Sequence, residues 1–427
     1  MGQGSKSKLF FKQVALMSAA KVGGLFVIPA FALSLGPSRF GILDTYLAVS
    51  SVLVIAMNQE RVQSSVSRII GNDERNFEEG GYFWIFYLIL AYLSFTILSV
   101  RFDEHFSATV IVLTAVIYSI SLFFQEYLRW SGSSDVYFYF ALLDAVALLG
   151  IPLLSIYLSI YDIETYVFML VCSRLLPVIL LGAIYKHRLS PLKRLVELSS
   201  LSYSVGATYL SNVVPATCYT ILQGSLGLMD RLLLLTSEKL NEDLIGNVSL
   251  SYRLAWGLSG VFLIAWQVVV QPKIASDLLQ SKTVAPAWIR QLLPPVVAVI
   301  VIICTIIVSR SPVLLTFVSR NFPEYSDTLN YFSWHLGGII LINALLFFPE
   351  LITKRKFSLI LVSGMCSVLI GLAYYFFDFP IRYLVYIVGA TYFSLICFFT
   401  SGLKVRLLIM MPVMFSLPVL DNVLLRF

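Results

Sequence analysis

The chain has 427 residues, of which 58% are hydrophobic and only 13% are charged, and its formal net charge is +6. Soluble domains contain about 45–50% apolar and about 25% charged residues. A water-soluble fold of this length needs more charge to cover its surface, so this class is excluded. No polar stretch is long enough to form a soluble catalytic domain. Composition therefore predicts an all-α polytopic membrane protein whose function lies within the membrane.

Apolar runs long enough to cross the hydrocarbon, which takes about 20 residues, predict about twelve transmembrane helices. The first run is preceded by a short basic segment without a small-residue cleavage site, so we expect it to be a retained span rather than a removed signal peptide. In chain order the spans lie near 9–35, 42–62, 81–100, 106–127, 136–160, 164–185, 202–236, 244–271, 291–309, 326–350, 357–377 and 382–403.

Lysine and arginine in the connecting loops predict the orientation and the division of the chain. With the N-terminus inside, the inside loops hold roughly three times as many Lys and Arg as the outside loops, so both termini are expected in the cytoplasm. The strongest basic loop, 186–198, leaves six spans on each side. We therefore expect two six-helix lobes, 1–190 and 191–404, followed by a hydrophobic tail at 405–427 that is interfacial, re-entrant or a thirteenth span.

An even number of spans in each half predicts halves related by an axis along the membrane normal, if the halves are homologous. The two halves share weak sequence features that fit such a repeat. Gly41 and Gly246 occupy the same place, each near the start of a helix, and the leading helix of each half carries a proline, Pro29 or Pro215. Prolines in spans bend helices and release backbone groups that a cavity can use.

Five basic residues fall inside the predicted spans rather than in the loops. Lys21, Arg174 and Arg253 lie about nine to twelve residues from a span end, which is too deep for easy snorkelling at 1.5 Å per residue. Arg61 and Arg231 lie near span ends, where an interfacial anchor is the favoured interpretation. A charge at the centre of a span costs at least about 2.5–3.5 kcal/mol, so the deep cations are expected to face protein or a wet cavity.

Fewer acidic residues lie at comparable depth. Asp144 could pair with one of the deep cations, whereas Asp230 and Arg231 are sequence neighbours that need not pair with each other; all three are candidates for an ion pair or a coupling role. The balance predicts a surplus of deep positive charge. Two interpretations remain open: structural ion pairs that lock helices together, or a cationic cavity between the lobes that attracts an anion such as a phosphate. His335 lies mid-span, where a buried neutral imidazole is favoured over a proton carrier.

No metal site, disulfide or cofactor is predicted. The cysteines lie within apolar runs without CxxC or Cys/His spacing, at Cys172, Cys218, Cys304, Cys366 and Cys397. No phosphate-binding P-loop occurs for the use of ATP, so we expect an ion gradient, H⁺ or Na⁺, to supply any energy.

Three segments resemble the polysaccharide-unit flippases of the multidrug/oligosaccharidyl-lipid/polysaccharide exporter superfamily. LGPSRFG at 35–41 looks like their L-G-x-x-x-[FY]-G turn. The stretch 227–276 is similar to their second-half signature, with Asp-Arg ending one span, G-x-x-x-x-x-Y-[RK]-[LF] opening the next and Pro-Lys-[IL] closing it. SPVLLTFVSRNFPEYSDTLNYFSW looks like the short outer helix before their tenth span. The resemblance implies two six-helix lobes around a V-shaped central cavity.

The resemblance and the deep cations predict a non-enzymatic flippase of the inner membrane. It would move an undecaprenyl-diphosphate-linked oligosaccharide, an O-antigen or capsular repeat unit, by alternating access, with Lys21, Arg174 and Arg253 binding the diphosphate head. Other polysaccharide-assembly proteins are possible partners, and nucleic acid is not expected. Two alternatives remain. A drug/cation antiporter of the same superfamily would favour a cavity rich in carboxylates, and an O-antigen polymerase or ligase would demand a large outside loop. The longest outside connection is only about sixteen residues, counting against an enzyme.

Overall fold

The computed structural model describes residues 27–70, 89–96, 108–130, 134–160, 162–184, 203–236, 242–265, 303, 311–325, 327–343, 357–377, 379–399 and 418. Within these ranges every regular element is a helix and no strand occurs. The predicted segments 9–26, most of 291–309 and nearly all of the tail 405–427 lie outside the described residues.

The described helices follow the predicted spans closely. Their bounds are α2 Pro37–Ile70, α4 Ala108–Trp130, α5 Ser134–Tyr157, α6 Ile163–Ile184, α8 Tyr203–Thr236, α9 Glu242–Ala265, α12 Pro312–Asn321, α13 Thr328–Ile342, α15 Phe357–Phe376 and α16 Leu384–Phe399, with short 3₁₀ turns η2 Pro323–Tyr325 and η4 Ile381–Tyr383. α5, α6, α8 and α15 match the expected ranges to within a turn. α2 is longer than its predicted span at both ends, because helical structure continues into polar sequence that hydropathy does not count as membrane-spanning.

Two described helices, Ile163–Ile184 and Ser358–Phe376, are long and apolar enough to cross a membrane. Three shorter apolar helices are Ala108–Leu122, Leu142–Tyr157 and Ile381–Ile396. The count of about twelve spans and the two six-helix lobes therefore stay predictions.

By contacts the chain separates into two compact units whose boundaries differ from the predicted break at 190/191. Unit 1 comprises Met1–Val27 and Tyr46–Ile221, and unit 2 comprises Ile28–Thr45 and Leu222–Phe427. The two helices of 34 residues, α2 and α8, each contribute one part to each unit. The first turns of α2 therefore pack with elements that follow them by about 200 residues.

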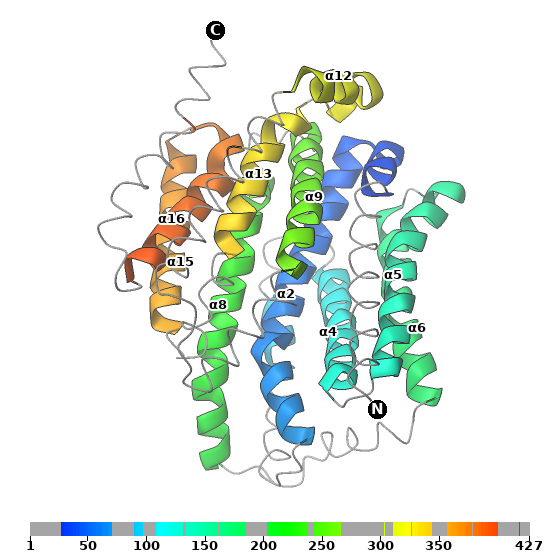
Figure 1. Ribbon diagram of the computed structural model, residues 1–427, viewed down its shortest axis with the longest axis vertical. Helices are drawn as coiled ribbons and strands as arrows, with labels where there is room; N and C mark the ends of the chain where they lie inside the picture. Colours follow the sequence, from blue (N-terminus) through cyan, green and yellow to red (C-terminus); the bar gives the residue numbers. More distant parts are fainter. Residues whose placement is uncertain are drawn as a thin grey trace. The chain divides into compact units, whose positions relative to one another are not determined.

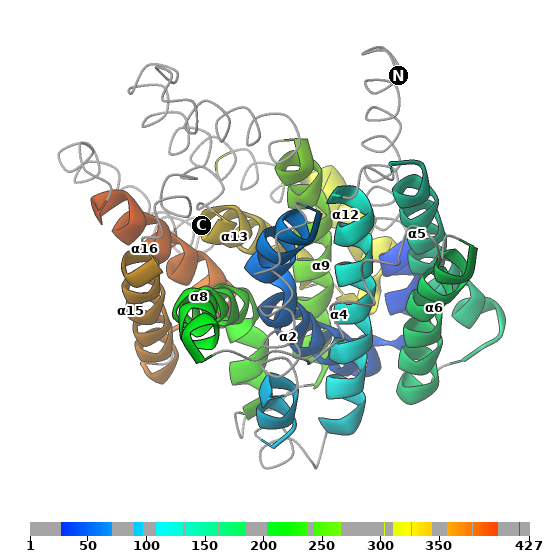
Figure 2. The same ribbon diagram turned by 90° about the horizontal axis from the view of Figure 1, so that it is seen from below.

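In unit 1, α4, α5 and α6 pack against one another as a three-helix group (Figure 2). Phe124 of α4 and Phe140 of α5 approach with ring centroids 5.9 Å apart, and both are buried. The hydroxyl of Ser50 on α2 donates to the backbone oxygen of Ile111 on α4 at 3.4 Å. These contacts fix the α4–α6 group around small and aromatic side chains.

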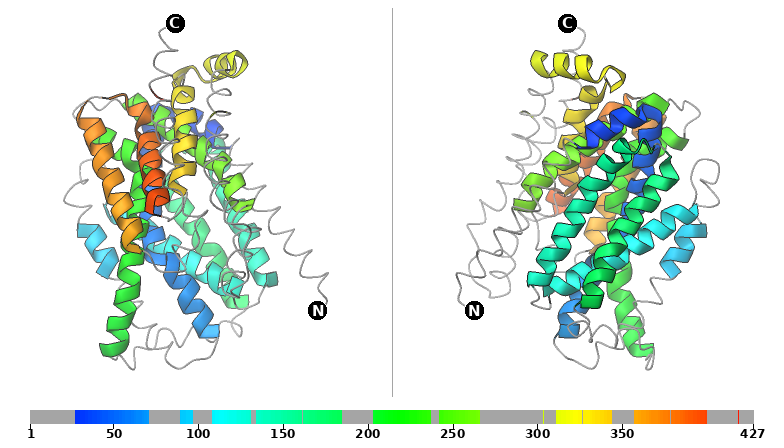
Figure 3. Two further views of the ribbon diagram at one scale, coloured as in Figure 1. Left: turned by 60° about the vertical axis from the view of Figure 1, so that its left-hand side comes forward. Right: turned by 90° about the vertical axis from the view of Figure 1, so that its right-hand side faces the viewer.

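In unit 2, α13 is the central helix and packs on α9 and α16, and α16 also packs on α15 (Figure 1). Trp334 of α13 lies edge-on to Tyr383 and Tyr386, with ring centroids 4.7 and 5.1 Å away. α12 runs across the end of α13 instead of along it (Figure 3). It lies in the segment that resembles the flippases' short outer helix.

The two glycines of the LGPSRFG segment have different structural roles. Gly36 has a φ of +76°, which L side chains rarely adopt, and it separates residues 27–35 from α2. Gly41 permits close contact with α9, because a Cβ there would lie 2.8 Å from the backbone nitrogen of Gly246. A Cβ on Gly246 would lie 2.2 Å from the carbonyl oxygen of Pro37. The close approach of α2 and α9 therefore depends on glycine at both positions.

Candidate functional site

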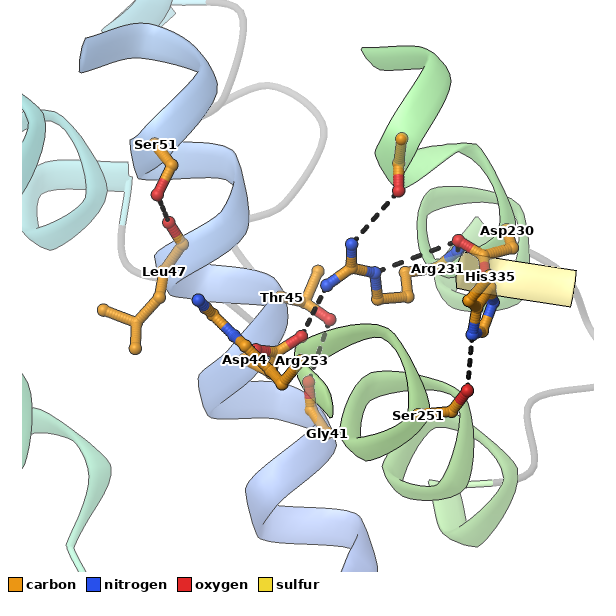
Figure 4. A network of polar contacts seen from close by, with 11 residues as sticks. Gly41, Asp44, Thr45, Leu47, Ser51, Asp230, Arg231, Ser251, Arg253 and His335 are labelled. Atoms are coloured by element: carbon orange, nitrogen blue, oxygen red, sulfur yellow. Dashed lines mark hydrogen bonds and ion pairs between the residues drawn. The ribbon is translucent and has the colours of Figure 1, made fainter. Parts of the chain in front are cut away.

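A single carboxylate in unit 2 binds two arginines. Asp44 on α2 accepts a hydrogen bond from Nη1 of Arg231 on α8 at 2.5 Å through Oδ2, and another from Nε of Arg253 on α9 through Oδ1 (Figure 4). The side chains of Asp44 and Arg231 are 1% and 0% exposed, whereas that of Arg253 is 27% exposed. Three helices are thus joined at one point, and Arg253 is the partly exposed member.

Arg231 is enclosed on every side. Its Nη2 donates to the carbonyl oxygen of Gly227 at 3.2 Å, and its guanidinium lies 3.8 Å from the ring centroid of Tyr252. The Nε atom is buried without a hydrogen-bond partner in the described part of the chain, 3.9 Å from Oδ1 of Asp230. Cation–π contact and charge pairing together compensate for burying this guanidinium.

A second buried group adjoins the first. Nε2 of His335 on α13 lies 2.8 Å from Oδ2 of Asp230, and its Nδ1 lies 2.6 Å from Oγ of Ser251 on α9 (Figure 4). Asp230 also accepts the backbone N–H of Arg231 at 2.8 Å. All three side chains of this group, Asp230, His335 and Ser251, are at most 1% exposed. Together with Asp44, Arg231 and Arg253 they form one network, called the unit 2 network below.

Unit 1 contains a smaller arrangement. Nη1 of Arg174 on α6 pairs with Oδ1 of Asp144 on α5, and the guanidinium lies 5.1 Å from the ring centroid of Tyr118 on α4. The side chains of Arg174 and Asp144 are 16% and 22% exposed. This pair links adjacent helices and is partly exposed.

The structure brings most of the predicted site residues together in two clusters. Arg174 and Asp144 are brought together, and Arg253 joins Arg231 and Asp230 in the unit 2 network. Lys21 lies outside the described residues, as does the side chain of Arg61.

Two expectations from the sequence are corrected. Arg231 is not an interfacial anchor, because its side chain is fully buried and paired. Its position near a span end does not reveal that α2 and α9 pack around it. The surplus of deep positive charge is also absent from these two clusters: Arg174 is balanced by Asp144, and Arg231 and Arg253 by Asp44 and Asp230. The predicted balance does not include Asp44.

Sequence reasoning missed Asp44 and Ser251. The sequence does contain a signal for Asp44. This carboxylate follows Gly41 by three residues, so both lie on the same face of the helix, and a glycine on that face permits another helix to approach closely. Its partners were not available, since they lie 187 and 209 residues away. In the described ranges no group of three or more His, Cys, Asp or Glu side chains is arranged to hold a metal ion.

No family model and no curated protein matches this sequence. Among solved structures, the chain is similar to the crystal structure of an aspartate-to-asparagine mutant of the MATE transporter VcmN from Vibrio cholerae. The TM-score is 0.48 at 13% identity, and the match covers 94% of this chain and 98% of that chain.

Proposed function

We propose that the protein is a membrane transporter that flips a polyprenyl-diphosphate-linked oligosaccharide repeat unit, of the O-antigen or capsular kind, across the inner membrane by alternating access. In this mechanism the two predicted lobes alternately open to either side. The diphosphate head binds arginine while the polyprenyl tail stays in lipid. No covalent step is required, so the protein acts without enzymatic chemistry.

The observation that carries the proposal is the convergence of Arg231 and Arg253 on Asp44. Two guanidinium groups share this one carboxylate and are already oriented toward one anion, while the nearby Asp230 balances the second positive charge. Phosphate oxygens accept the same forked hydrogen bonds as carboxylate oxygens. A diphosphate can therefore bind the partly exposed Arg253 in competition with Asp44, at a site that we call the Arg253 site.

Substitution of Arg253 tests the proposed function without leaving Asp44 unpaired. In the Arg253→Ala variant the buried Asp44 keeps Arg231 as its partner, so no buried carboxylate is left unpaired. We expect this variant to accumulate normally in the membrane and to abolish surface polysaccharide. Arg253→Lys should retain part of the activity, because it keeps the charge and loses the fork.

The control is Arg39→Ala, since Arg39 is an exposed arginine on the same helix as Asp44, and we expect normal export. Immunoblotting of membranes and staining of surface polysaccharide give the two readouts. Normal export by an Arg253→Ala protein of normal abundance would overturn the proposal. Failure of that variant to accumulate would assign Arg253 to structural pairing instead.

One observation favours the drug/cation antiporter as a second candidate: the carboxylates of the described network balance its arginines. Two probes separate the candidates in purified protein held in lipid nanodiscs. Farnesyl diphosphate has the proposed head group on a short prenyl tail, and tetraphenylphosphonium is a lipophilic cation. The flippase should bind the first, with an affinity reduced about tenfold by Arg253→Ala, as expected for losing about 1.4 kcal/mol of charge-assisted hydrogen bonding. Binding of the cation alone would favour the antiporter.

A further inference from the structure

His335 is a buried imidazole with both ring nitrogens in hydrogen bonds. Its two partners come from different helices, Asp230 from α8 and Ser251 from α9, at 2.8 and 2.6 Å (Figure 4). The Arg253 site does not require such an arrangement. The hydrogen bonds of Asp44 go to Arg231 and Arg253, and those of His335 go to Asp230 and Ser251. The group therefore needs its own explanation.

The partners determine where a proton can be held. An ionised Asp230 can only accept, so Nε2 of His335 carries a proton toward it. Ser251 can both donate and accept, so Nδ1 can be satisfied in two ways. When Nδ1 is bare, the hydroxyl of Ser251 donates to it. When Nδ1 is protonated, it donates to Oγ of Ser251, whose hydrogen turns to a carbonyl one helical turn earlier, the usual acceptor for a helical serine.

Gain of a proton at Nδ1 therefore requires only that one hydroxyl hydrogen rotate, and no heavy atom has to move. The aromatic neighbours accommodate either form of the ring. Tyr331 stacks on His335 at 6.0 Å between centroids, and Tyr252 meets it edge-on at 5.9 Å. A backbone carbonyl or N–H in place of this hydroxyl would leave Nδ1 without a hydrogen bond in one of the two protonation states.

The charged and titratable groups that face His335 come from each element around it. α16, which packs on α13, contributes tyrosines and no Asp, Glu, Lys, Arg or His. His335 itself contacts Asp230 from α8, Tyr252 from α9 and Tyr331 from α13. The charged groups beyond these neighbours are Arg231, Arg253 and Asp44 around Tyr252, and Asp327 and Arg382 around Tyr331. With neutral His335 the two carboxylates and two arginines of the unit 2 network balance, so a proton makes the network positive.

We propose that His335, held between Asp230 and Ser251, is a proton-binding site whose occupancy tunes the Arg253 site. A positive His335 pairs fully with Asp230 and weakens its attraction for Arg231, whose Nε lies 3.9 Å from that carboxylate. Arg231 then depends more on Asp44, and Asp44 holds Arg253 less firmly. Arg253 becomes more available to an anion, and the extra charge attracts that anion as well.

The second half of this inference rests on the proposed function, while the proton site itself does not. The chain has three histidines, so His105→Gln with His187→Gln leaves His335 as the single imidazole. Protein labelled with ¹³C and ¹⁵N histidine in nanodiscs is titrated from about pH 5 to about pH 9, the range around the ordinary charge change of histidine. We expect one reversible single-proton transition of the ring. Chemical shifts that stay constant throughout would overturn the proton site.

The coupling is tested by adding farnesyl diphosphate to the same labelled protein. By reciprocity, the bound diphosphate should move the His335 transition to higher pH. In calorimetry at each pH, the affinity of the single-histidine protein relative to the His335→Gln protein should rise about fivefold or more as the pH falls, the low end of typical coupling. This ratio cancels the titration of the probe itself. The NMR shift provides the answer even if His335→Gln does not fold.

The outcomes separate the two proposals. A transition without farnesyl diphosphate binding would overturn the proposed substrate and leave the proton site standing. Binding with a pH-independent affinity ratio and an unmoved transition would overturn the coupling and leave the flippase proposal standing.

Discussion

The two charged clusters of this protein compensate the charge of arginine side chains on helices in different ways. In unit 1, Arg174 and Asp144 pair between adjacent helices and keep 16% and 22% of their side chains exposed. In unit 2, Asp44 and Arg231 are almost completely buried and belong to a network that joins four helices. The surroundings screen the charges of a partly exposed pair, so the pair contributes little to stability. A buried network must instead pair its charges internally. The two clusters should therefore respond differently to the same kind of substitution.

The largest expected effect is that of Asp44→Asn. Removing this charge leaves two arginines, one of them fully buried, without their shared carboxylate, and breaking a buried ion pair costs about 3–5 kcal/mol. We expect loss of folded protein in size-exclusion chromatography of detergent extracts. Asp144→Asn is the matched control in unit 1 and should remain monodisperse. Equal behaviour of the two variants would remove the distinction between the clusters.

Gly246→Ala tests the contact that holds α2 beside α9, and hence Asp44 beside Arg253. Its new methyl group would lie 2.2 Å from a carbonyl oxygen of Pro37, so the helices must separate, at a cost of about 1–3 kcal/mol. Gly182→Ala in α6 is the control, because nothing lies within 4 Å of its Cβ position, and it should be neutral or stabilising by about 0.5–1 kcal/mol. Thermal unfolding in detergent measures both. A Gly246→Ala protein as stable as the control would contradict the close contact.

A charge exchange sharpens the interpretation of the unit 1 pair. Arg174→Ala should abolish surface polysaccharide with normal protein abundance if Arg174 binds substrate. The double variant Asp144→Arg with Arg174→Asp restores the pairing with the charges reversed. Recovered export in the double variant would assign the pair to structure, because a substrate-binding arginine is not replaced by one on a neighbouring helix. Membrane abundance and surface polysaccharide are the readouts.

The smallest effect is expected at the start of α6. Asp162 precedes the helix, and its carboxylate accepts from the hydroxyl of Thr165 at 2.6 Å and from the backbone N–H of that residue at 2.8 Å. These bonds lower the pKa of Asp162 below its ordinary value of 3.8. Asp162→Ala should cost about 0.5–1 kcal/mol of stability, as for other exposed helix caps.

The sign of the pH dependence at Asp162 follows from the lowered pKa. Because the folded state favours the ionised form, this contribution is complete above pH 3.8 and is lost as the pH falls through the lower folded pKa. Asp162→Asn keeps a capping side chain and should remove only this acid sensitivity. Melting temperatures measured down to pH 3 compare the variants with the parent, and an unchanged acid response in Asp162→Asn would contradict the assignment.

Local sequence patterns were enough to predict the positions of several helices. Runs of apolar residues set where α5, α6, α8 and α15 lie, because period and hydropathy are local properties that survive without knowledge of neighbours. The depth of Arg174 and Arg253 was also readable, since depth is a count along one helix. Lys21 lies outside the described residues, so its place in the site remains a prediction.

How the charges are compensated depends on the packing of helices that are far apart in the sequence. Burial of Arg231 depends on helices that begin about 190 residues before it and about ten residues after it, and no local count reveals that convergence. The sequence does not show that Asp44 accepts hydrogen bonds from two arginines on other helices. His335 was expected to be buried and neutral, but the partners on both of its nitrogens are set by the packing of α8, α9 and α13. Electrostatic energy depends on distances in space, and the fold alone fixes those.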